Sequence, residues 1–322
     1  MTAGATAPRP YGASLETAAA LTRRVTQASV AVAVFLILIK AAAWKASGSV
    51  AMLASLTDSG LDLLASLATF MAVRWAAAPP DAEHRFGHGK GEAFASLLQA
   101  GLVCASAALI GREAIERLID PRPIEAGGWA IGVMAVSTLV TAGLVMMQTR
   151  VLRQANSVAV EGDRAHYMVD LASNGVALLG IGAAAVLAMP RLDAAAGLVV
   201  AIWLVWGAVE VFRKSSRQLL DRELPDEARA EILVRALADP HIGGVHQLRT
   251  RASGPYVHIQ MHVELDPQLS LEDAHAILVA AEKRILEAFP AADLILHADP
   301  RGRAEPHGGA FASGDRHGGK PR

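Results

Sequence analysis

Two acidic residues and a histidine–aspartate pair are the residues of this chain whose types and spacing most clearly predict chemistry. Asp58 and Asp62 lie four residues apart in the stretch SLTDSGLDLLAS, which is otherwise free of charge. His166 and Asp170 repeat this spacing in EGDRAHYMVD. On a helix, a spacing of four places each pair on one face with Cβ atoms about 5–6 Å apart. Together they offer three carboxylates and one imidazole, which suit a tetrahedral divalent transition metal.

The elements that must position these residues are predicted to be membrane-spanning helices. The chain of 322 residues is 52% hydrophobic and only 19% charged, with a mean hydropathy of +0.33, which is too apolar for an ordinary soluble protein. Six apolar runs each approach the roughly 20 residues that a helix needs to cross a bilayer. They are residues 25–46, 50–76, 92–118, 127–149, 168–189 and 192–212. The sequence therefore predicts an all-α six-helix transmembrane bundle over residues 25–215.

Basic residues around the predicted spans indicate their orientation. Most flanking Arg and Lys residues fall on one side of the membrane, which the positive-inside rule assigns to the cytoplasm. Both termini are then cytoplasmic. Residues 1–24 are expected to form a flexible N-terminal arm.

The cost of burying a charge in a membrane helps to choose between two roles for Asp58, Asp62, His166 and Asp170. An ionised carboxylate there costs from about 2.5 to more than 10 kcal/mol unless it is protonated, paired or hydrated. The structural explanation is a pair of interhelical hydrogen bonds that seal the bundle. Because ionisable residues within membranes serve function by default, we favour a metal site formed by Asp58, Asp62, His166 and Asp170.

After residue 215 the pattern changes to that of a water-exposed α+β domain. Residues 226–239 place aliphatic side chains at helical spacing and stop at Pro240. Residues 256–265, YVHIQMHVEL, alternate apolar and polar side chains, which is typical of a half-buried strand. Residues 245–251 precede this strand across an SGP turn, so the two segments predict a hairpin.

A second helix and a third strand complete the predicted domain. Ser270 and Asp273 form a capping box that opens the helix. Residues 293–299, DLILHAD, follow as the last strand. The αββαβ order predicts a small ferredoxin-like domain over residues 216–300 in the cytoplasm. The Gly-, His- and Pro-rich residues 301–322 are expected to be a disordered tail.

Two further groups of residues are candidate metal ligands. The loop after the second span holds Asp81, His84 and His88 among several glycines, and its alternative is an ordinary solvated loop. The C-terminal domain holds five histidine or aspartate residues of metal-binding type within sixty residues. Two of them are spaced to share a face of the last strand. Its alternative is a set of surface histidines that share no site. These five are His246, His262, His275, His297 and Asp299.

Composition also limits the function. Cys104 is the one cysteine, so neither a disulfide framework within the chain nor a thiolate metal centre is expected. The formal net charge of -1 predicts no nucleic-acid partner. Neither HExxH nor GxSxG occurs, which argues against a membrane metalloenzyme.

At these positions the chain resembles the cation diffusion facilitators, in particular the bacterial zinc and ferrous-iron efflux type. SLTDSGLDLLAS resembles the family's second-helix motif, HRFGHGK the loop motif after that helix, and DRAHYMVD the fifth-helix motif. LLDRELPDEA resembles the junction to the cytoplasmic domain. The resemblance covers about residues 25–300 and leaves both termini outside.

The resemblance implies roles for the candidate residues. The four intramembrane residues would be the transport site, the loop residues a second site, and the five cytoplasmic residues a two-metal site at a homodimer interface. His275 would there bind across the dimer, and Ala298 stands where some relatives carry a ligand. Lys90 and Asp221 would form an ion pair between the loop and the domain, unless both charges are simply exposed. The expected location is the bacterial inner membrane.

The resemblance further implies a proton-coupled antiporter that exports divalent metal. With His166 neutral, three carboxylates give the empty site a formal charge of -3, so it should take up protons. Metal binding needs deprotonated ligands, so metal and protons compete for one site. Zn(II) is the expected substrate and also the structural or regulatory ion, with Cd(II), Fe(II) and Co(II) tolerated. A metal sensor without flux, and a channel without proton coupling, are the alternatives.

Overall fold

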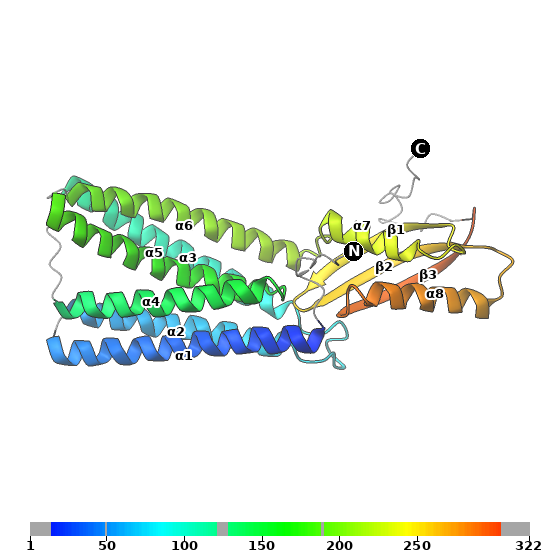
Figure 1. Ribbon diagram of the computed structural model, residues 1–322, viewed down its shortest axis with the longest axis horizontal. Coiled ribbons are helices and arrows are strands. Elements are labelled where there is room, and N and C mark those ends of the chain that lie inside the picture. The colour runs from blue at the N-terminus through cyan, green and yellow to red at the C-terminus, as the bar shows by residue number, and fades with distance from the viewer. Residues whose placement is uncertain (1–13, 49, 121–127, 188–189, 304–322) are drawn as a thin grey trace, which may run out of the picture.

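The structure is a computed structural model that describes residues 14–48, 50–120, 128–187 and 190–303. Its N-terminal part is a bundle of long helices that run along one another, and a smaller domain lies at one end of the bundle (Figure 1). The helices are α1 (Leu15–Ser47), α2 (Val50–Ala76), α3 (Gly91–Ile119), α4 (Gly128–Leu152), α5 (Val158–Leu187) and α6 (Pro190–Leu219).

The length and composition of these helices fit a membrane bundle. Within the described residues, five stretches are long and apolar enough to cross a membrane, in α1, α2, α3, α4 and α6. The charged residues of α5, among them Asp163, His166 and Asp170, face its neighbours, because α5 packs against α2, α3, α4 and α6. The six predicted spans therefore correspond to six helices.

Two helices begin earlier than the sequence indicated. Residues 15–24 belong to α1 instead of a flexible arm, because the Ser14 hydroxyl caps the helix by accepting the Thr17 N–H at 3.3 Å. Val25 is fully buried near that end, so the first turns are held by packing. The other helix is α5, which starts at Val158, ten residues before the predicted span. The rest of the predicted arm, residues 1–13, lies outside the described residues.

The C-terminal domain has the predicted order of elements. These are α7 (Asp226–Ala236), β1 (Gly244–Ser253), β2 (Tyr256–Leu265), α8 (Leu271–Leu286) and β3 (Ala292–Pro300). The sheet order is β1-β2-β3, with β1 antiparallel and β3 parallel to β2. Ser270 is confirmed as the N-cap of α8, since its hydroxyl accepts the Asp273 N–H at 3.1 Å. The predicted tail from residue 304 onward lies outside the described residues.

The alternation in β2 divides the sheet into two different faces. Ile259, Met261 and Val263 are buried in a core with Ile232 of α7 and Ile285 of α8, so the helices cover this face. The intervening polar residues of β2 point to the other face. That face carries the candidate ligands.

The loop between α2 and α3 packs against the hairpin turn of the C-terminal domain. Gly89 touches Ser253 so closely that an added Cβ would overlap the Ser253 carbonyl. The Tyr256 hydroxyl donates to the Ala78 carbonyl at 3.2 Å. Gly254, at φ 56°, has the left-handed conformation that glycine tolerates and lies against Gly89. These contacts hold the domain at the end of the bundle.

Candidate metal sites

The intramembrane residues meet where α2 and α5 face each other. The spacing of four on each helix turns Asp62 toward His166, and Asp62 Oδ1 lies 2.9 Å from His166 Nε2. Ligand atoms of Asp62, His166 and Asp170 all lie within 4.8 Å of one another. Asp62 and His166 are only 5% and 6% exposed. Three of the four predicted residues therefore lie together, with Asp62 and His166 buried and Asp170 partly buried.

Asp58 lies beside this group without belonging to it. Its side chain is exposed, one turn along α2 from Asp62, and it lines the same cavity of about 270 Å³ as the other three residues. A polar cavity of this size admits water and ions. Asp58 is thus placed to meet an ion that approaches Asp62 and Asp170.

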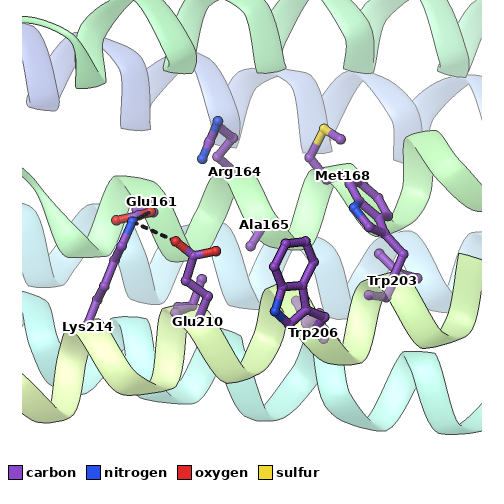
Figure 2. Close-up of a pocket in the computed structure, with 12 residues that line it drawn as sticks. Glu161, Arg164, Ala165, Met168, Trp203, Trp206, Glu210 and Lys214 are labelled. Atoms are coloured by element: carbon purple, nitrogen blue, oxygen red, sulfur yellow. Dashed lines mark hydrogen bonds and ion pairs between the residues drawn. The ribbon is translucent and has the colours of Figure 1, made fainter.

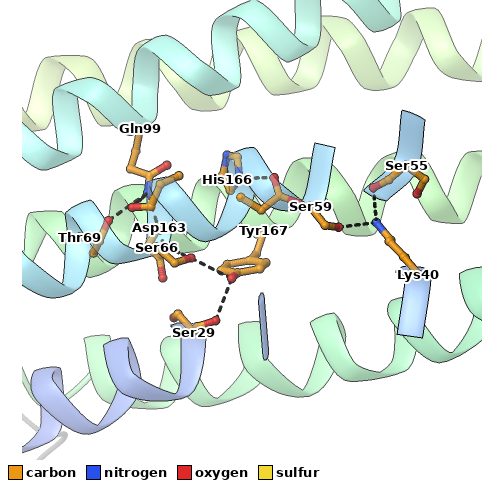
Figure 3. A network of polar contacts seen from close by, with 12 residues as sticks. Ser29, Lys40, Ser55, Ser59, Ser66, Thr69, Gln99, Asp163, His166 and Tyr167 are labelled. Atoms are coloured by element: carbon orange, nitrogen blue, oxygen red, sulfur yellow. Dashed lines mark hydrogen bonds and ion pairs between the residues drawn. The ribbon is translucent and has the colours of Figure 1, made fainter. Parts of the chain in front are cut away.

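Lys40 of α1 is a residue at this cavity that the sequence analysis did not single out. Its ammonium donates to the Ser59 hydroxyl at 2.6 Å and to the Ser55 carbonyl at 3.3 Å (Figure 3). The signal was available, because a lysine within the apolar run FLILIK is costly in a membrane.

A second buried carboxylate, Asp163, lies one turn from His166 on α5. Gln148 donates to Asp163 Oδ2 at 2.9 Å, while Gln99 and the Ser66 hydroxyl donate to Oδ1 at 3.4 Å. The Ser66 hydroxyl also contacts the Tyr167 hydroxyl at 2.9 Å (Figure 3). This network joins α5 to α2, α3 and α4. It holds the helix that presents His166 and Asp170.

Glu92 explains why α5 begins as early as Val158. The buried Glu92 carboxylate accepts the Ser157 hydroxyl at 2.6 Å and backbone N–H groups of Val158 and Ala159. A carboxylate at a helix N-terminus satisfies N–H groups that have no partner within the helix. The first turn of α5 is therefore tied to α3. This contact between distant segments has no local signature in the sequence.

The three loop residues also come together. Asp81 Oδ2 lies 3.2 Å from His88 Nε2, and Asp81 Oδ1 lies 3.3 Å from His84 Nδ1. Hydrogen bonds from the backbone N–H groups of His84 and Glu83 lower the pKa of Asp81 and keep it ionised. Trp75 packs on both histidines, with its ring centre 5.3 Å from that of His88. The loop thus presents three ligand groups within reach of one ion.

A row of histidines crosses the open face of the C-terminal sheet. The register places His246, His262 and His297 side by side on β1, β2 and β3. A bulge after His246, where Gln247 has φ 50°, keeps both Val245 and Leu248 directed inward.

One carboxylate completes this row. Asp299 lies 2.9 Å from His262, 3.1 Å from His246 and 3.3 Å from His297. Burial, together with the two neighbouring imidazoles, outweighs the attraction of Asp299 and lowers the pKa of His262, which favours the neutral form that binds metal.

The fifth predicted ligand of this site is not brought to it within one chain. His275 is exposed on α8, and α8 packs on the opposite face of the sheet. Strand alternation also places Ala298 on the face opposite His297 and Asp299. One chain therefore supplies four of the five predicted ligands.

The expected ion pair is present at the junction. Lys90 Nζ lies 2.9 Å from Asp221 Oδ1, and Arg251 lies 3.1 Å from the other oxygen. Partial burial raises the pKa of Asp221, but the hydrogen bond and charge of Lys90, with those of Arg251, outweigh it and leave the pKa below its usual value. Arg251 of β1, which is not among the residues predicted from the sequence, joins the pair.

A second cavity of about 260 Å³ lies between α3, α5 and α6, apart from the metal ligands. Figure 2 shows Lys214 of α6 directed at Glu161 and Glu210, with Trp203 and Trp206 further along the helix. The Lys214–Glu161 distance is 2.6 Å. Lys214 is thus paired with both carboxylates that line this cavity.

A helical membrane bundle with a buried metal-ligand cluster, joined to a small α+β domain, is the architecture of a cation transporter. Residues 26–220 match the family described as the cation efflux transmembrane domain, and residues 224–301 match the cation efflux protein, cytoplasmic domain. The chain therefore belongs to the cation efflux family, the cation diffusion facilitators. It is a multi-pass membrane transporter and not an enzyme.

Curated relatives give the same assignment over most of the chain. The cation-efflux pump FieF of Klebsiella pneumoniae is 40% identical over 280 residues, which cover 87% of this chain and 93% of the pump. FieF of Shewanella oneidensis is 42% identical over 278 residues, covering 85% and 93%. FieF of Salmonella arizonae is 39% identical over 280 residues, covering 87% and 93%.

Proposed function

We propose that this protein exports divalent metal, above all Zn(II), in exchange for protons. The observation that carries the proposal is the buried contact of 2.9 Å between Asp62 and His166, with Asp170 beside them in a cavity that Asp58 also lines. These four residues would form the transport site. Cation-efflux relatives of similar length support export as the direction.

The charge of the site accounts for proton coupling. Three carboxylates in a poorly solvated place need cations to balance them, and both metal ions and protons can do so. Because metal binds only the deprotonated ligands, each ion displaces the other. Facing the cytoplasm, the site would release protons and bind metal. Facing the more acidic outside, it would take up protons and release metal.

The ligand types favour zinc among the divalent ions. Three carboxylate oxygens and one imidazole nitrogen suit a tetrahedral d¹⁰ ion, and Cd(II), Fe(II) or Co(II) would bind with similar chemistry. The absence of thiolate from the proposed ligands disfavours Cu(I). Zinc is therefore the first metal to test.

The other two clusters would bind metal that is not transported. Asp81, His84 and His88 would form a loop site. The row of His246, His262, His297 and Asp299 would hold structural or regulatory zinc. In a homodimer, the partner's His275 would complete this site from the exposed face of its helix. We place the protein in the bacterial inner membrane, with both termini and residues 216–300 in the cytoplasm.

A metal sensor is the second candidate, because the histidine row alone could report cytoplasmic metal. Zinc uptake into proteoliposomes with an internal pH dye separates the two. The parent should exchange zinc for protons, and Asp62→Ala should not. Glu210→Gln, which removes a carboxylate beside the other cavity, is the matched control and should keep the parent rate. Zinc binding without flux in the parent would overturn transport and favour the sensor.

A further inference from the structure

Lys40 places a positive charge at the proposed transport site. It lies on α1 in an apolar run, is partly buried, and lines the cavity that Asp58, Asp62 and Asp170 share. A lysine inside a membrane segment is costly unless it is paired or hydrated. Its position therefore needs an explanation beyond packing.

The ammonium of Lys40 is held in place by α2. Its bonds to the Ser59 hydroxyl and the Ser55 carbonyl use two of its three N–H donors. Ser59 is buried, and it lies on the same helix between Asp58 and Asp62. The charge is thus anchored at the cavity that Asp58 and Asp170 also line.

The charge of Lys40 changes the net charge of the proposed transport site. Asp58, Asp62 and Asp170 contribute -3 when ionised, and Lys40 contributes +1, so the sum is -2 with His166 neutral. A divalent cation brings this sum to zero. A loaded site without net charge is the least costly to carry through a poorly solvated bundle.

We propose that Lys40 is a specificity-determining residue that acts as the fixed counter-charge of the transport site, matching it to a divalent cation and limiting how tightly that cation is held. This inference rests on the proposed function of the α2–α5 site. Repulsion between the ammonium and the bound ion weakens binding, so the ion leaves when the site opens outward. Lys40 touches serine oxygens and need not coordinate the metal.

A purely structural role makes a different prediction. If Lys40 only tied α1 to α2, its removal would loosen the bundle and would leave zinc affinity unchanged or weaker. If Lys40 is a counter-charge, its removal should strengthen zinc binding while it slows turnover. The sign of the change in affinity therefore distinguishes the two roles.

The test measures zinc affinity on the full-length protein in detergent, by competition with a fluorescent zinc chelator. The background is His88→Ala with His262→Ala, which removes ligands of the other two clusters. Lys40→Gln and Lys40→Met are the neutral variants, and Lys40→Arg keeps the charge. Lys45→Gln, at the exposed end of the same helix, is the control.

We expect both neutral variants to lower the zinc Kd by roughly ten- to a hundredfold, since an unscreened like charge is removed. Their zinc flux in proteoliposomes should fall at least about fivefold because release slows. Lys40→Arg and Lys45→Gln should keep the parent Kd. A Kd that is unchanged or higher in either folded neutral variant overturns the inference.

Lys40→Arg keeps the inference falsifiable even where neutral variants do not fold, since a tenfold change in its Kd would also overturn the inference. Failure of the proposed function looks different. In that case the unmodified protein binds zinc without transporting it, while the affinity series still reports whether Lys40 opposes the bound ion.

Discussion

The α2–α5 site and the histidine row on the C-terminal sheet hold opposite mixtures of candidate metal ligands. In the membrane, Asp58, Asp62 and Asp170 outnumber one imidazole, and Asp62 and His166 are almost fully buried. On the sheet, three imidazoles share one carboxylate. The side chains of His246, His262 and Asp299 are 14–16% exposed, and that of His297 is 60% exposed.

Under the proposed function, this difference would let one chain both move and retain the same metal. In the proposed function, a buried, carboxylate-rich site is unstable without balancing cations, so it would exchange metal for protons. Neutral imidazoles near solvent bear little charge when empty and need no replacement ion. The first site suits turnover, and the second suits stable occupancy.

The largest expected effect comes from Asp170→Ala. This substitution should abolish zinc–proton exchange at the membrane site and leave the histidine row unaffected. Loss of a residue that only supports a metal ligand typically lowers metal affinity or activity about 10- to 100-fold. Loss of a ligand itself should therefore lower zinc flux by at least about a hundredfold. Proteoliposome uptake measures the flux. Zinc binding by the histidine row should persist. Exchange of zinc for protons at the parent rate would remove Asp170 from the transport site.

The next largest effect concerns the histidine row. At a hundredfold excess over Kd, bound zinc should stabilise the C-terminal domain by about 2.7 kcal/mol. His262→Ala should remove this stabilisation, measured as the zinc-dependent shift in thermal unfolding of the full chain. His241→Ala, an exposed histidine of the same domain outside the row, is the control.

A double variant of the same histidine row tests regulation. If the row senses cytoplasmic metal, combining His262→Ala with His297→Ala should abolish activation of transport by zinc and leave basal flux intact. Unchanged activation in that double variant would restrict the row to holding the domain or the dimer.

A smaller effect is expected at Asp163, which supports the membrane site without belonging to its ligand group. Asp163→Ala removes the acceptor of Gln148 and Gln99, and each unmade buried bond costs about 1–3 kcal/mol. Thermal unfolding in detergent should show the loss. Asp163→Asn keeps an acceptor oxygen and should lose less. If Asp163→Asn were fully stable yet inactive, Asp163 would act in the ion path.

Much of the fold was predictable because its patterns are local. Apolar runs of membrane length, the N-cap at Ser270 and the alternation of β2 each depend on a few neighbouring residues, and the structure contains all three elements. The i, i+4 spacing likewise predicted that Asp62 and His166 occupy helix faces that can meet.

The parts that escaped prediction depend on contacts between distant segments. Glu92 of α3 extends α5 to Val158, and Ser14 with local packing extends α1 to Leu15. The apolar run around Lys40 marks it as unusual, but its position at the site depends on the packing of α1 against α2. His275 lies on the other side of the sheet from the row, so its predicted contact across a dimer stays a prediction.

The smallest expected effect lies at the junction that connects the two compared regions. Lys90 and Asp221 are 37% and 38% exposed, so solvent screening limits their pair to less than about 1 kcal/mol. A double-mutant cycle with Lys90→Ala and Asp221→Asn isolates the coupling. Asp221→Asn alone should cost more than Lys90→Ala, because it also releases Arg251.

The pH dependence of this coupling follows from the lowered pKa of Asp221. A carboxylate whose folded pKa lies below its unfolded value of about 3.9 contributes its full stability above that value and loses it as the pH falls through the folded pKa. The coupling energy should therefore stay constant from pH 5 to about 8 and vanish only in stronger acid. A coupling that disappears near pH 6 would point to a histidine, such as His258 beside Arg251, as the group that joins the regions.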